Sequence, residues 1–215
     1  MNINDTELYR ITHIENLQYI LRKGLFSSNS HEIDPNFKSM GNKNIIEIRK
    51  NRPAPNPPGG YLGDYVPFYF GKRSPMLYNI ATGWEDILQI PQEEIIYLVV
   101  TVGKVLEYQL QFFFADGHVV LDTSTPYTDP KDLNKLDWNA INARQWTSDD
   151  DDLRRKEKKQ SEFLIKDHVP LSCITKIVTY NESAERIVRQ ELEKVSQTDQ
   201  IEVLTDQWEY YYANV

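Results

Sequence analysis

Arg49 to Tyr78 reads RKNRPAPNPPGGYLGDYVPFYFGKRSPMLY, a run that combines prolines, paired glycines, aromatics and cations. Proline removes a backbone donor and glycine is costly to order, so we expect no long helix or strand here. Because the run is too aromatic for a disordered linker, we expect its rings to bury or stack a large flat group, beside cations that meet anionic groups. The rings are Tyr61, Tyr65, Phe68, Tyr69, Phe70 and Tyr78, and the cations are Arg49, Lys50, Arg52, Lys72 and Arg73. An ordered loop that caps the core is the alternative interpretation.

The composition predicts a single domain over residues 1–215, which is long enough to bury a core without disulfides. Cys173 is the only cysteine, so no disulfide can form within the chain, and a reducing compartment fits. We expect no metal, because the histidines lack the clustered spacing of a zinc site: they are His13, His31, His118 and His168. No signal-peptide pattern and no apolar stretch of membrane-spanning length is present, which predicts a soluble, cytoplasmic protein.

The formal net charge is −8, from 24 Lys plus Arg against 32 Asp plus Glu. This balance argues against broad, nonspecific adhesion to nucleic acid. The charges are nevertheless unevenly distributed, with base at 49–52, 72–73 and 154–159 and acid at 149–152 and 182–193. The asymmetry permits a polyanion to dock on one face.

Residues 9–13 alternate like a short strand, and Thr12 followed by Glu15 predicts a capping box that opens a helix. Gly24 is the expected left-handed stop just beyond the end of that helix. The apolar residues on its inner face are Leu17, Ile20 and Leu21. His13 would then lie where a strand turns into a helix, a position from which a side chain can point into a cleft.

Four further segments have the apolar or β-branched character of strands. Residues 95–102, IIYLVVTV, form a near-continuous apolar run and predict a central strand covered on both faces. The others are 112–114, 161–166 and 174–180. Asn181 would cap a final amphipathic helix whose shared apolar face comprises Ala184, Ile187, Val188, Leu192 and Val195. Strands and helices are mixed without a regular βαβ repeat, so the predicted fold class is α+β.

Two longer insertions, Ser27 to Asn44 and Asp122 to Lys159, lack a strong strand signal. Loops of this size in a compact domain usually serve function. The second insertion has enough apolar area for one or two short helices over the active face, from Leu133, Leu136, Trp138, Ile141 and Trp146. It then leads through the basic run 154–159 to Glu162.

Glu162 lies in KKQSEFLI, at the mouth of a predicted strand. A carboxylate there could accept a hydrogen bond from a sugar hydroxyl and stabilise a developing oxocarbenium ion. The alternative is a surface glutamate paired with Lys158 or Lys159. His13 could bind a ribose hydroxyl or could only cap or pack, and His118 follows Asp116 and Gly117 in what reads as a turn. Neither G-x-x-x-x-G-K-[ST] nor G-x-G-x-x-G occurs, which excludes phosphate binding by those loops.

Three segments in fixed order resemble the DarT family of bacterial toxins: YRITHIENLQYILRKGL at 9–25, IRKNRPAPNPPGGYLGDYVPFYFGKRSPMLY at 48–78, and KKQSEFLI at 158–165. The middle segment is the most specific of the three. The resemblance implies a DNA ADP-ribosyltransferase with a fold like that of poly(ADP-ribose) polymerases and diphtheria toxin. That fold is a split, mostly antiparallel β-sheet core with flanking helices.

The resemblance also implies roles for individual residues. His13 falls at the NAD ribose or its neighbouring phosphate, with Thr12 and Asn16 beside it, and Glu162 falls on the catalytic acid that holds the nicotinamide-ribose 2′-hydroxyl. Arg49 falls on the arginine that organises NAD and the acceptor base, although Arg52 lies within a short shift of it. Tyr69 and Met76 fall in the nicotinamide pocket. The expected DNA contacts are His118, Arg73, Arg154 and Arg155.

The predicted activity is therefore NAD-dependent ADP-ribosylation of bases in single-stranded DNA, with thymidine favoured. A reactive base nitrogen must be unpaired to reach the donor, which favours a single strand. The alternatives are guanine, RNA or protein as the acceptor, or a noncatalytic nucleotide-binding module. The resemblance further implies a cognate antitoxin with an ADP-ribose-removing macrodomain. No metal and no membrane partner is expected.

Overall fold

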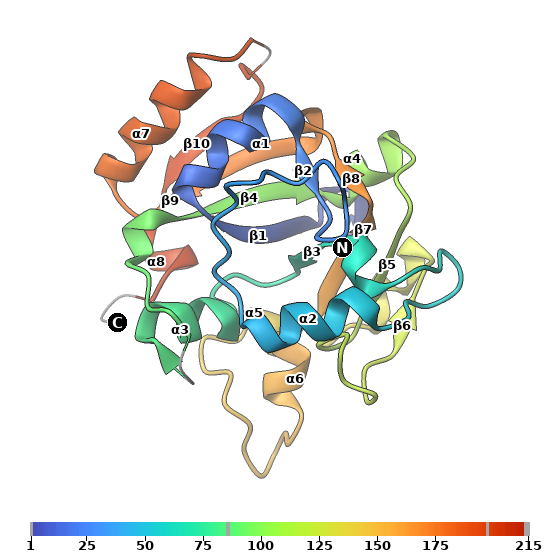
Figure 1. Cartoon of the computed structure of the whole chain (residues 1–215). Coiled ribbons are helices and arrows are strands. Elements are labelled where there is room, and N and C mark those ends of the chain that lie inside the picture. Colours follow the sequence, from blue (N-terminus) through green and yellow to red (C-terminus); the bar gives the residue numbers. More distant parts are fainter. Residues whose placement is uncertain (1, 85–86, 197, 213–215) are drawn as a thin grey trace.

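The computed structural model describes residues 2–84, 87–196 and 198–212. Its centre is an eight-stranded sheet in the order β10-β9-β4-β1-β3-β7-β5-β6 (Figure 1). The strands are β1 Glu7–His13, β3 Tyr65–Tyr69, β4 Ile95–Thr101, β5 Phe112–Ala115, β6 Pro126–Tyr127, β7 Glu162–Lys166, β9 Ile174–Thr179 and β10 Glu202–Thr205. Neighbouring strands are antiparallel, except that β9 and β10 run parallel. The predicted α+β class with a mostly antiparallel sheet is confirmed.

Helices flank this sheet, and a separate two-stranded ladder joins β2 Leu25–Phe26 to β8 His168–Val169. The helices are α1 Leu17–Lys23, α2 Lys43–Asn51, α3 Pro75–Thr82, α4 Val102–Glu107, α5 Trp138–Asn142, α6 Arg155–Lys159, α7 Glu182–Leu192 and α8 Gln207–Tyr210. In Figure 1, α1 and α7 lie on one side of the sheet, and α2 and α3 lie toward the other. Within the described ranges, no helix is long and apolar enough to cross a membrane.

The sheet buries both of its faces because β1 and β4 alternate their side chains between two cores. One core joins Leu8, Leu98 and Val100 to the inner faces of α1 and α7. The other joins Tyr9, Val99 and α3 to the aromatic C-terminal segment at 210–211. All but the last residue of β4 is buried, which confirms the prediction of a central strand covered on both faces.

The predicted strands at 9–13, 95–102, 112–114, 161–166 and 174–180 correspond to β1, β4, β5, β7 and β9. The Asn181 cap is also confirmed, because its side chain accepts a hydrogen bond from the Ala184 amide at 2.9 Å. The prediction for Ile187 is wrong: its side chain is 46% exposed, outside the apolar face of α7. Nor is α7 the final element, since β10 and α8 follow it.

The predicted capping box between Thr12 and Glu15 is also wrong. Thr12 belongs to β1, and its hydroxyl accepts a hydrogen bond from the side-chain Nδ2 of Asn16 at 3.0 Å. His13 caps the turn instead, since its Nδ1 accepts from the Glu15 amide at 3.2 Å. A histidine ring nitrogen therefore takes the place that the threonine hydroxyl was expected to occupy.

The segment 49–78 contains only short elements, as its prolines and glycines predict. Helix α2 ends at Asn51, just before Pro53, and its Asn42 cap accepts hydrogen bonds from the Asn44 and Ile45 amides. The expectation that its rings surround a flat ligand is largely wrong. Core packing buries Tyr65, Phe68 and Phe70, and Tyr61 is half exposed. Of the six rings, Tyr69 and Tyr65 line a cavity.

The sheet splits between β1 and β3, and Pro67 supplies a physical reason. The two strands pair at Tyr9 and Tyr69, and two residues before Tyr69 in β3 stands Pro67, which has no N–H for the ladder. Its carbonyl oxygen instead accepts a hydrogen bond from Nη1 of Arg10 at 2.9 Å. The diverging ends of β1 and β3 border the site described below.

Both insertions lie where the sheet opens. The second insertion contains β6, the 3-10 helix Pro130–Lys135, α5 and α6, which confirms the predicted short helices. The first insertion is attached to α1 through Asn16, whose side chain donates to the Lys38 carbonyl at 3.0 Å and accepts from the Lys38 amide at 2.8 Å. This double hydrogen bond holds the first insertion in front of β1.

Gly24, the predicted stop of α1, has φ +81°, and its amide donates to the Ile20 carbonyl. A Cβ at this position would lie 2.4 Å from the Val169 carbonyl oxygen. We expect Gly24→Ala to lower the free energy of unfolding by about 2 kcal/mol or more, from strain and clash together. Chemical denaturation measures this loss. Gly41→Ala is the matched control, since Gly41 has no positive φ and a Cβ there meets Ile46 Cδ1 at 3.3 Å. Equal losses in the two variants would contradict the prediction.

Candidate active site

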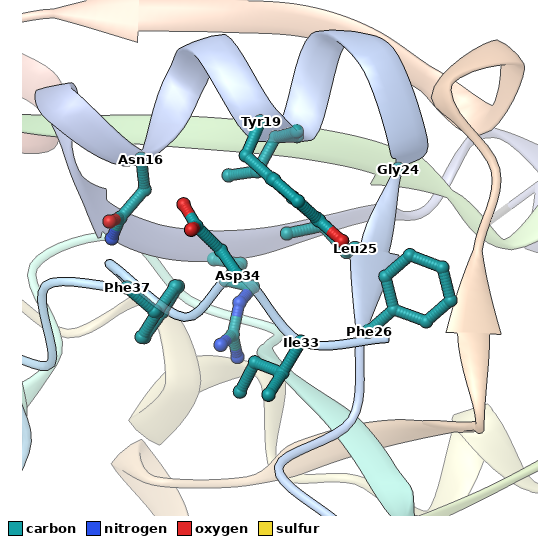
Figure 2. A pocket seen from close by; sticks show the side chains of 10 residues that line it. Asn16, Tyr19, Gly24, Leu25, Phe26, Ile33, Asp34 and Phe37 are labelled. Atoms are coloured by element: carbon teal, nitrogen blue, oxygen red, sulfur yellow. The ribbon is translucent and has the colours of Figure 1, made fainter. Parts of the chain in front are cut away.

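A cavity of about 430 Å³ lies between α2 and the strands β1, β3 and β7. We call it the main cavity. Helix α2 buries none of its residues, because its inner side faces this hollow rather than packed side chains. The wall includes Arg10, Thr12, Arg49, Tyr69, Met76, His118 and Glu162. A smaller cavity of about 20 Å³ lies between α1 and the first insertion (Figure 2).

Glu162 begins β7 and is paired in the sheet with Tyr69 on one side and Ala115 on the other. Its side chain is buried, with an exposed fraction of 2%. Oε2 accepts a hydrogen bond from Nη1 of Arg49 at 2.9 Å, and Oε1 accepts from the Val119 amide at 3.3 Å. The alternative of a surface glutamate paired with Lys158 or Lys159 is therefore wrong. The carboxylate is instead held rigidly at the wall of the main cavity.

Arg49 and Arg52 differ clearly in their environment. Arg49 lies in the last turn of α2 and pairs with Glu162, and its Nη2 is buried without a hydrogen-bond partner. Arg52 follows the helix and forms an ion pair with the exposed Asp122. Arg49 is therefore the arginine that contacts the buried glutamate, a choice that the sequence left open.

His118 is buried beside the same carboxylate, with Nε2 3.6 Å from Oε1 of Glu162. Burial lowers the pKa of His118, Glu162 opposes this shift, and Arg49 and Arg52 add to it. The imidazole is therefore neutral at pH 7. Its loop is held by Ser124, whose hydroxyl donates to the His118 carbonyl at 2.9 Å.

The lowered pKa of His118 makes stability depend on pH. Just below the ordinary value of about 6.5, the unfolded chain binds a proton here that the folded chain does not. The contribution to stability is therefore lost as pH falls through this range. We expect the free energy of unfolding to fall less steeply in His118→Asn, by at most about 1.4 kcal/mol per pH unit. Urea unfolding of both proteins between about pH 7.5 and pH 5 measures this, and parallel curves would contradict it.

Tyr69 and Met76 lie together on the wall of the main cavity, where the resemblance placed the nicotinamide pocket. The Tyr69 hydroxyl lies 3.7 Å from the Met76 sulfur. Burial raises the pKa of Tyr69, and the nearby Glu162 raises it further. A neutral ring and a thioether make a flat, weakly polar wall, which suits an aromatic amide.

His13, Thr12 and Asn16 are adjacent but serve different parts of the structure. Thr12 lines the main cavity, and Asn16 lines the small one (Figure 2). His13 is buried and contributes to the wall of neither: its Nε2 lies 3.1 Å from Oε2 of Glu94. A contact between His13 and a bound nucleotide stays a prediction, and it would require the pair with Glu94 to open or be shared.

Four cations of the basic run 154–159 already have partners within the protein. Arg154 donates to Glu157 and to the Thr123 carbonyl, and Arg155 pairs with Asp149. Lys158 pairs with Asp137 and Asp152, and Lys159 is buried with its amine on the Ile141 carbonyl. Arg73 has φ +50° and lies 3.8 Å from Glu209. DNA contacts by Arg73, Arg154 and Arg155 stay predictions.

Sequence reasoning missed Arg10, which lies on β1 and lines both cavities. The available signal was a charged residue within a strand whose neighbours Tyr9 and Ile11 are apolar.

Among the described residues, no group of three or more His, Cys, Asp and Glu side chains could hold a metal ion.

Comparison with known proteins shows where this architecture occurs. The family model described as "ssDNA thymidine ADP-ribosyltransferase, DarT" matches residues 9–212. A DNA ADP-ribosyl transferase of Escherichia coli O127:H6 is 37% identical over 194 residues, which are 90% of this chain and 87% of that protein. A fusion of a DNA ADP-ribosyl transferase with a DNA ADP-ribosyl glycohydrolase, from Thermosipho africanus, is 37% identical over 75 residues, 34% of this chain and 19% of that protein.

The solved structures of DarT from Thermus sp. 2.9 match the whole fold. Its complex with ADP-ribosylated single-stranded DNA superposes with a TM-score of 0.88 at 37% identity, covering 96% of this chain and 97% of that one. Its complex with NAD+ gives a TM-score of 0.84 at 36% identity, covering 96% and 98%. The split sheet and its buried glutamate thus have the architecture of an ADP-ribosyltransferase. The chain belongs to the DarT family of single-stranded DNA thymidine ADP-ribosyltransferases.

Proposed function

We propose that this chain transfers ADP-ribose from NAD to thymidine in single-stranded DNA, with the donor in the main cavity. The observation that carries the proposal is the buried ion pair of Glu162 and Arg49 at the cavity wall, with Nη1 and Oε2 2.9 Å apart. The family and the NAD+ and DNA complexes of the Thermus relative support both substrates. The membership of all eight strands in one sheet supports one domain over residues 1–215.

Glu162 would act where positive charge develops. When the bond between nicotinamide and ribose breaks, its electron pair leaves with nicotinamide and the anomeric carbon becomes electron-poor. A carboxylate held within a buried site stabilises that charge more strongly than one in water, and it can also accept a hydrogen bond from the ribose 2′-hydroxyl. Val119 and Arg49 hold the two carboxylate oxygens, so little reorganisation is required during the reaction.

Arg49 and the cavity wall would position the two reactants. The second terminal nitrogen of Arg49, Nη2, has no hydrogen-bond partner among the described residues, so it would be available to donate to an acceptor base or to the donor. Tyr69 and Met76 would hold nicotinamide, and Thr12 lies near enough to the donor to contact it. The attacking base nitrogen forms the new bond to the anomeric carbon and releases its proton.

Thymidine requires an unpaired strand for a chemical reason. The only ring N–H of thymine is N3, and duplex DNA uses this group in base pairing. The nitrogen must therefore be unpaired before it can reach the donor. His118 borders both Glu162 and the outer loop 119–124, which makes it the best-placed residue to contact the base.

Product analysis tests the proposal directly. The purified chain is incubated with NAD and with single-stranded oligonucleotides of equal length that contain or lack thymine, and with RNA and protein in parallel. Mass spectrometry of the digested nucleosides and peptides is expected to find ADP-ribosyl-thymidine only from the thymine-containing DNA. Equal modification of the thymine-free strand would overturn the thymidine assignment. A product on RNA or protein alone would overturn DNA as the acceptor.

We further propose that the chain acts in the cytoplasm and is neutralised by an antitoxin with a macrodomain that removes ADP-ribose. A bacterial cytoplasm contains both NAD and single-stranded DNA. The Thermosipho relative joins transferase and glycohydrolase in one polypeptide, which supports a functional pair of these two activities. Removal of the thymidine modification by a coexpressed macrodomain protein is the expected result.

A further inference from the structure

Arg10 is a partly buried cation that has no acidic partner among the described residues. Its Nη1 donates to the Pro67 carbonyl at 2.9 Å, and its Nε is buried with no hydrogen-bond partner. Burial lowers the pKa of Arg10 to about 10, with Arg49 as the next cause, so the guanidinium stays charged at neutral pH. No carboxylate of the described residues forms an ion pair with it. A partly buried charge with an unsatisfied buried N–H is costly, and Arg10 lines a cavity from which an anion can reach it.

The cavity that Arg10 borders has an excess of positive charge. The charged side chains on its wall are four cations and one carboxylate: Arg10, Lys38, Arg49, Lys50 and Glu162. Three of the cations already have acidic partners, because Lys38 pairs with Glu15, Lys50 with Glu47 and Arg49 with Glu162. Arg10 is the cation of this wall without an acidic partner among the described residues. It is therefore available to bind an anionic ligand.

The place of Arg10 in the sheet separates it from the reacting end of the cavity. Strand β3 lies between β1, which carries Arg10, and β7, which carries Glu162. The strand axes are therefore roughly 10 Å apart. In a dinucleotide, one ribose and its 5′ carbon separate the anomeric carbon at nicotinamide from the pyrophosphate. A donor whose ribose lies at Glu162 can thus bring its phosphates toward Arg10.

The small cavity does not offer an alternative seat for the anion. Arg10 also borders this space, which Asn16, Tyr19, Phe26 and Asp34 help to enclose (Figure 2). Its volume of about 20 Å³ suits about one water molecule and is too small for a phosphate group. Asp34 on its wall would also repel an anion. The main cavity is therefore the side from which Arg10 is approached.

We propose that Arg10 binds the pyrophosphate of the ADP-ribose donor, while Arg49 stays with Glu162 at the reacting end. This inference rests on the proposed function, since it takes the donor to be NAD. A guanidinium suits the task because its planar N–H groups match phosphate oxygens and keep their charge when buried. The resemblance assigned Arg49 to organising NAD and the acceptor base, and the ion pair with Glu162 keeps that residue at the reacting end.

Variants of Arg10 test this assignment in the full chain. Arg10→Gln removes the charge but keeps a donor for the Pro67 carbonyl, and Arg10→Lys keeps the charge but loses the planar donors. Arg22→Gln is the matched control, because Arg22 is exposed at the end of α1. Calorimetry with ADP-ribose, which carries the pyrophosphate, and with adenosine, which carries no phosphate, separates the anionic contact from general damage. Thermal unfolding of each variant confirms that it is folded.

We expect Arg10→Gln to weaken ADP-ribose binding by about 10- to 100-fold, the effect of losing charged hydrogen bonds, and to leave adenosine binding unchanged. Arg10→Lys should lose less. In steady-state assays KM for NAD should rise by a similar factor while kcat changes less than about threefold, as for an interaction that is equal in ground and transition states. If Arg10→Gln does not fold, the Arg10→Lys comparison of the same two ligands decides.

Two results would overturn the inference and leave the proposed function intact. One is unchanged ADP-ribose affinity in folded Arg10→Gln that still modifies DNA. The other is an equal loss for adenosine and ADP-ribose, which would mean that Arg10 only supports the fold. Failure of the proposed function looks different, because the wild-type chain would then bind no NAD or ADP-ribose and would yield no modified DNA.

Discussion

Glu162→Gln is expected to slow ADP-ribose transfer by about a hundred- to a thousandfold while NAD binding changes only a few-fold. The substitution keeps the shape of the side chain, and the amide oxygen can still accept the hydrogen bond that Arg49 gives to Oε2 at 2.9 Å. What is lost is the negative charge that faces the electron-poor anomeric carbon. The loss of one preorganised electrostatic contact in a buried site typically costs about 3 to 4 kcal/mol in the transition state.

Single-turnover assays with a thymine-containing single strand measure this loss, and calorimetry with NAD measures binding. Glu107→Gln is the matched control, because Glu107 is exposed on α4 and pairs only with Lys104. The control should react like the wild-type chain. If Glu162→Gln retained more than about a tenth of the wild-type rate, the carboxylate would not be the electrostatic catalyst.

Arg49→Ala is expected to reduce transfer by about a hundredfold or more, while Arg52→Ala stays within a few-fold of the wild-type rate. Removal of Arg49 takes away the arginine that pairs with the buried Glu162 carboxylate, which keeps its contacts with the Val119 amide and His118. An unpaired buried carboxylate favours its protonated form, which cannot stabilise positive charge. The Nη2 donor, which has no hydrogen-bond partner among the described residues, is lost as well.

The pair of arginine variants decides between the two residues that the sequence could not separate. Initial rates with NAD and a thymine-containing oligonucleotide give the comparison, and urea unfolding shows whether Arg49→Ala has also lost stability. A larger loss in Arg52→Ala than in Arg49→Ala would contradict the assignment of Arg49. Equal, small losses would mean that neither guanidinium takes part in the reaction.

The regular elements were predictable where the sequence pattern is strong. Residues 95–102 are almost uniformly apolar, and they form the buried strand β4. Asn181 and Gly24 have side-chain and backbone properties that act locally, so the helix boundaries they predict are confirmed. The pattern failed where tertiary contacts compete: Ile187 is apolar but exposed, and the strand β10 and helix α8 lacked a strong signal.

The candidate site was predictable as a set of residue types and only partly as an arrangement. The aromatic rings of the segment 49–78 were expected around a ligand, but Tyr65, Phe68 and Phe70 are buried in the core. Arg154 and Arg155 were expected to contact DNA, but in the structure both pair with acids, as does Lys158. Arg10 was overlooked because its importance depends on the opening between β1 and β3.

The sequence by itself determined the short elements of the segment Arg49 to Tyr78, since proline and glycine act on the backbone wherever they stand. It also determined the family, because the residue types in the three segments 9–25, 48–78 and 158–165 resemble those of the family. Only the tertiary structure decided which of these residues meet. Glu162 lies 113 positions from Arg49 along the chain, and sheet pairing through β3 and the packing of α2 bring their atoms to 2.9 Å. Such distant contacts depend on the relative placement of whole elements, which no local pattern of residues encodes.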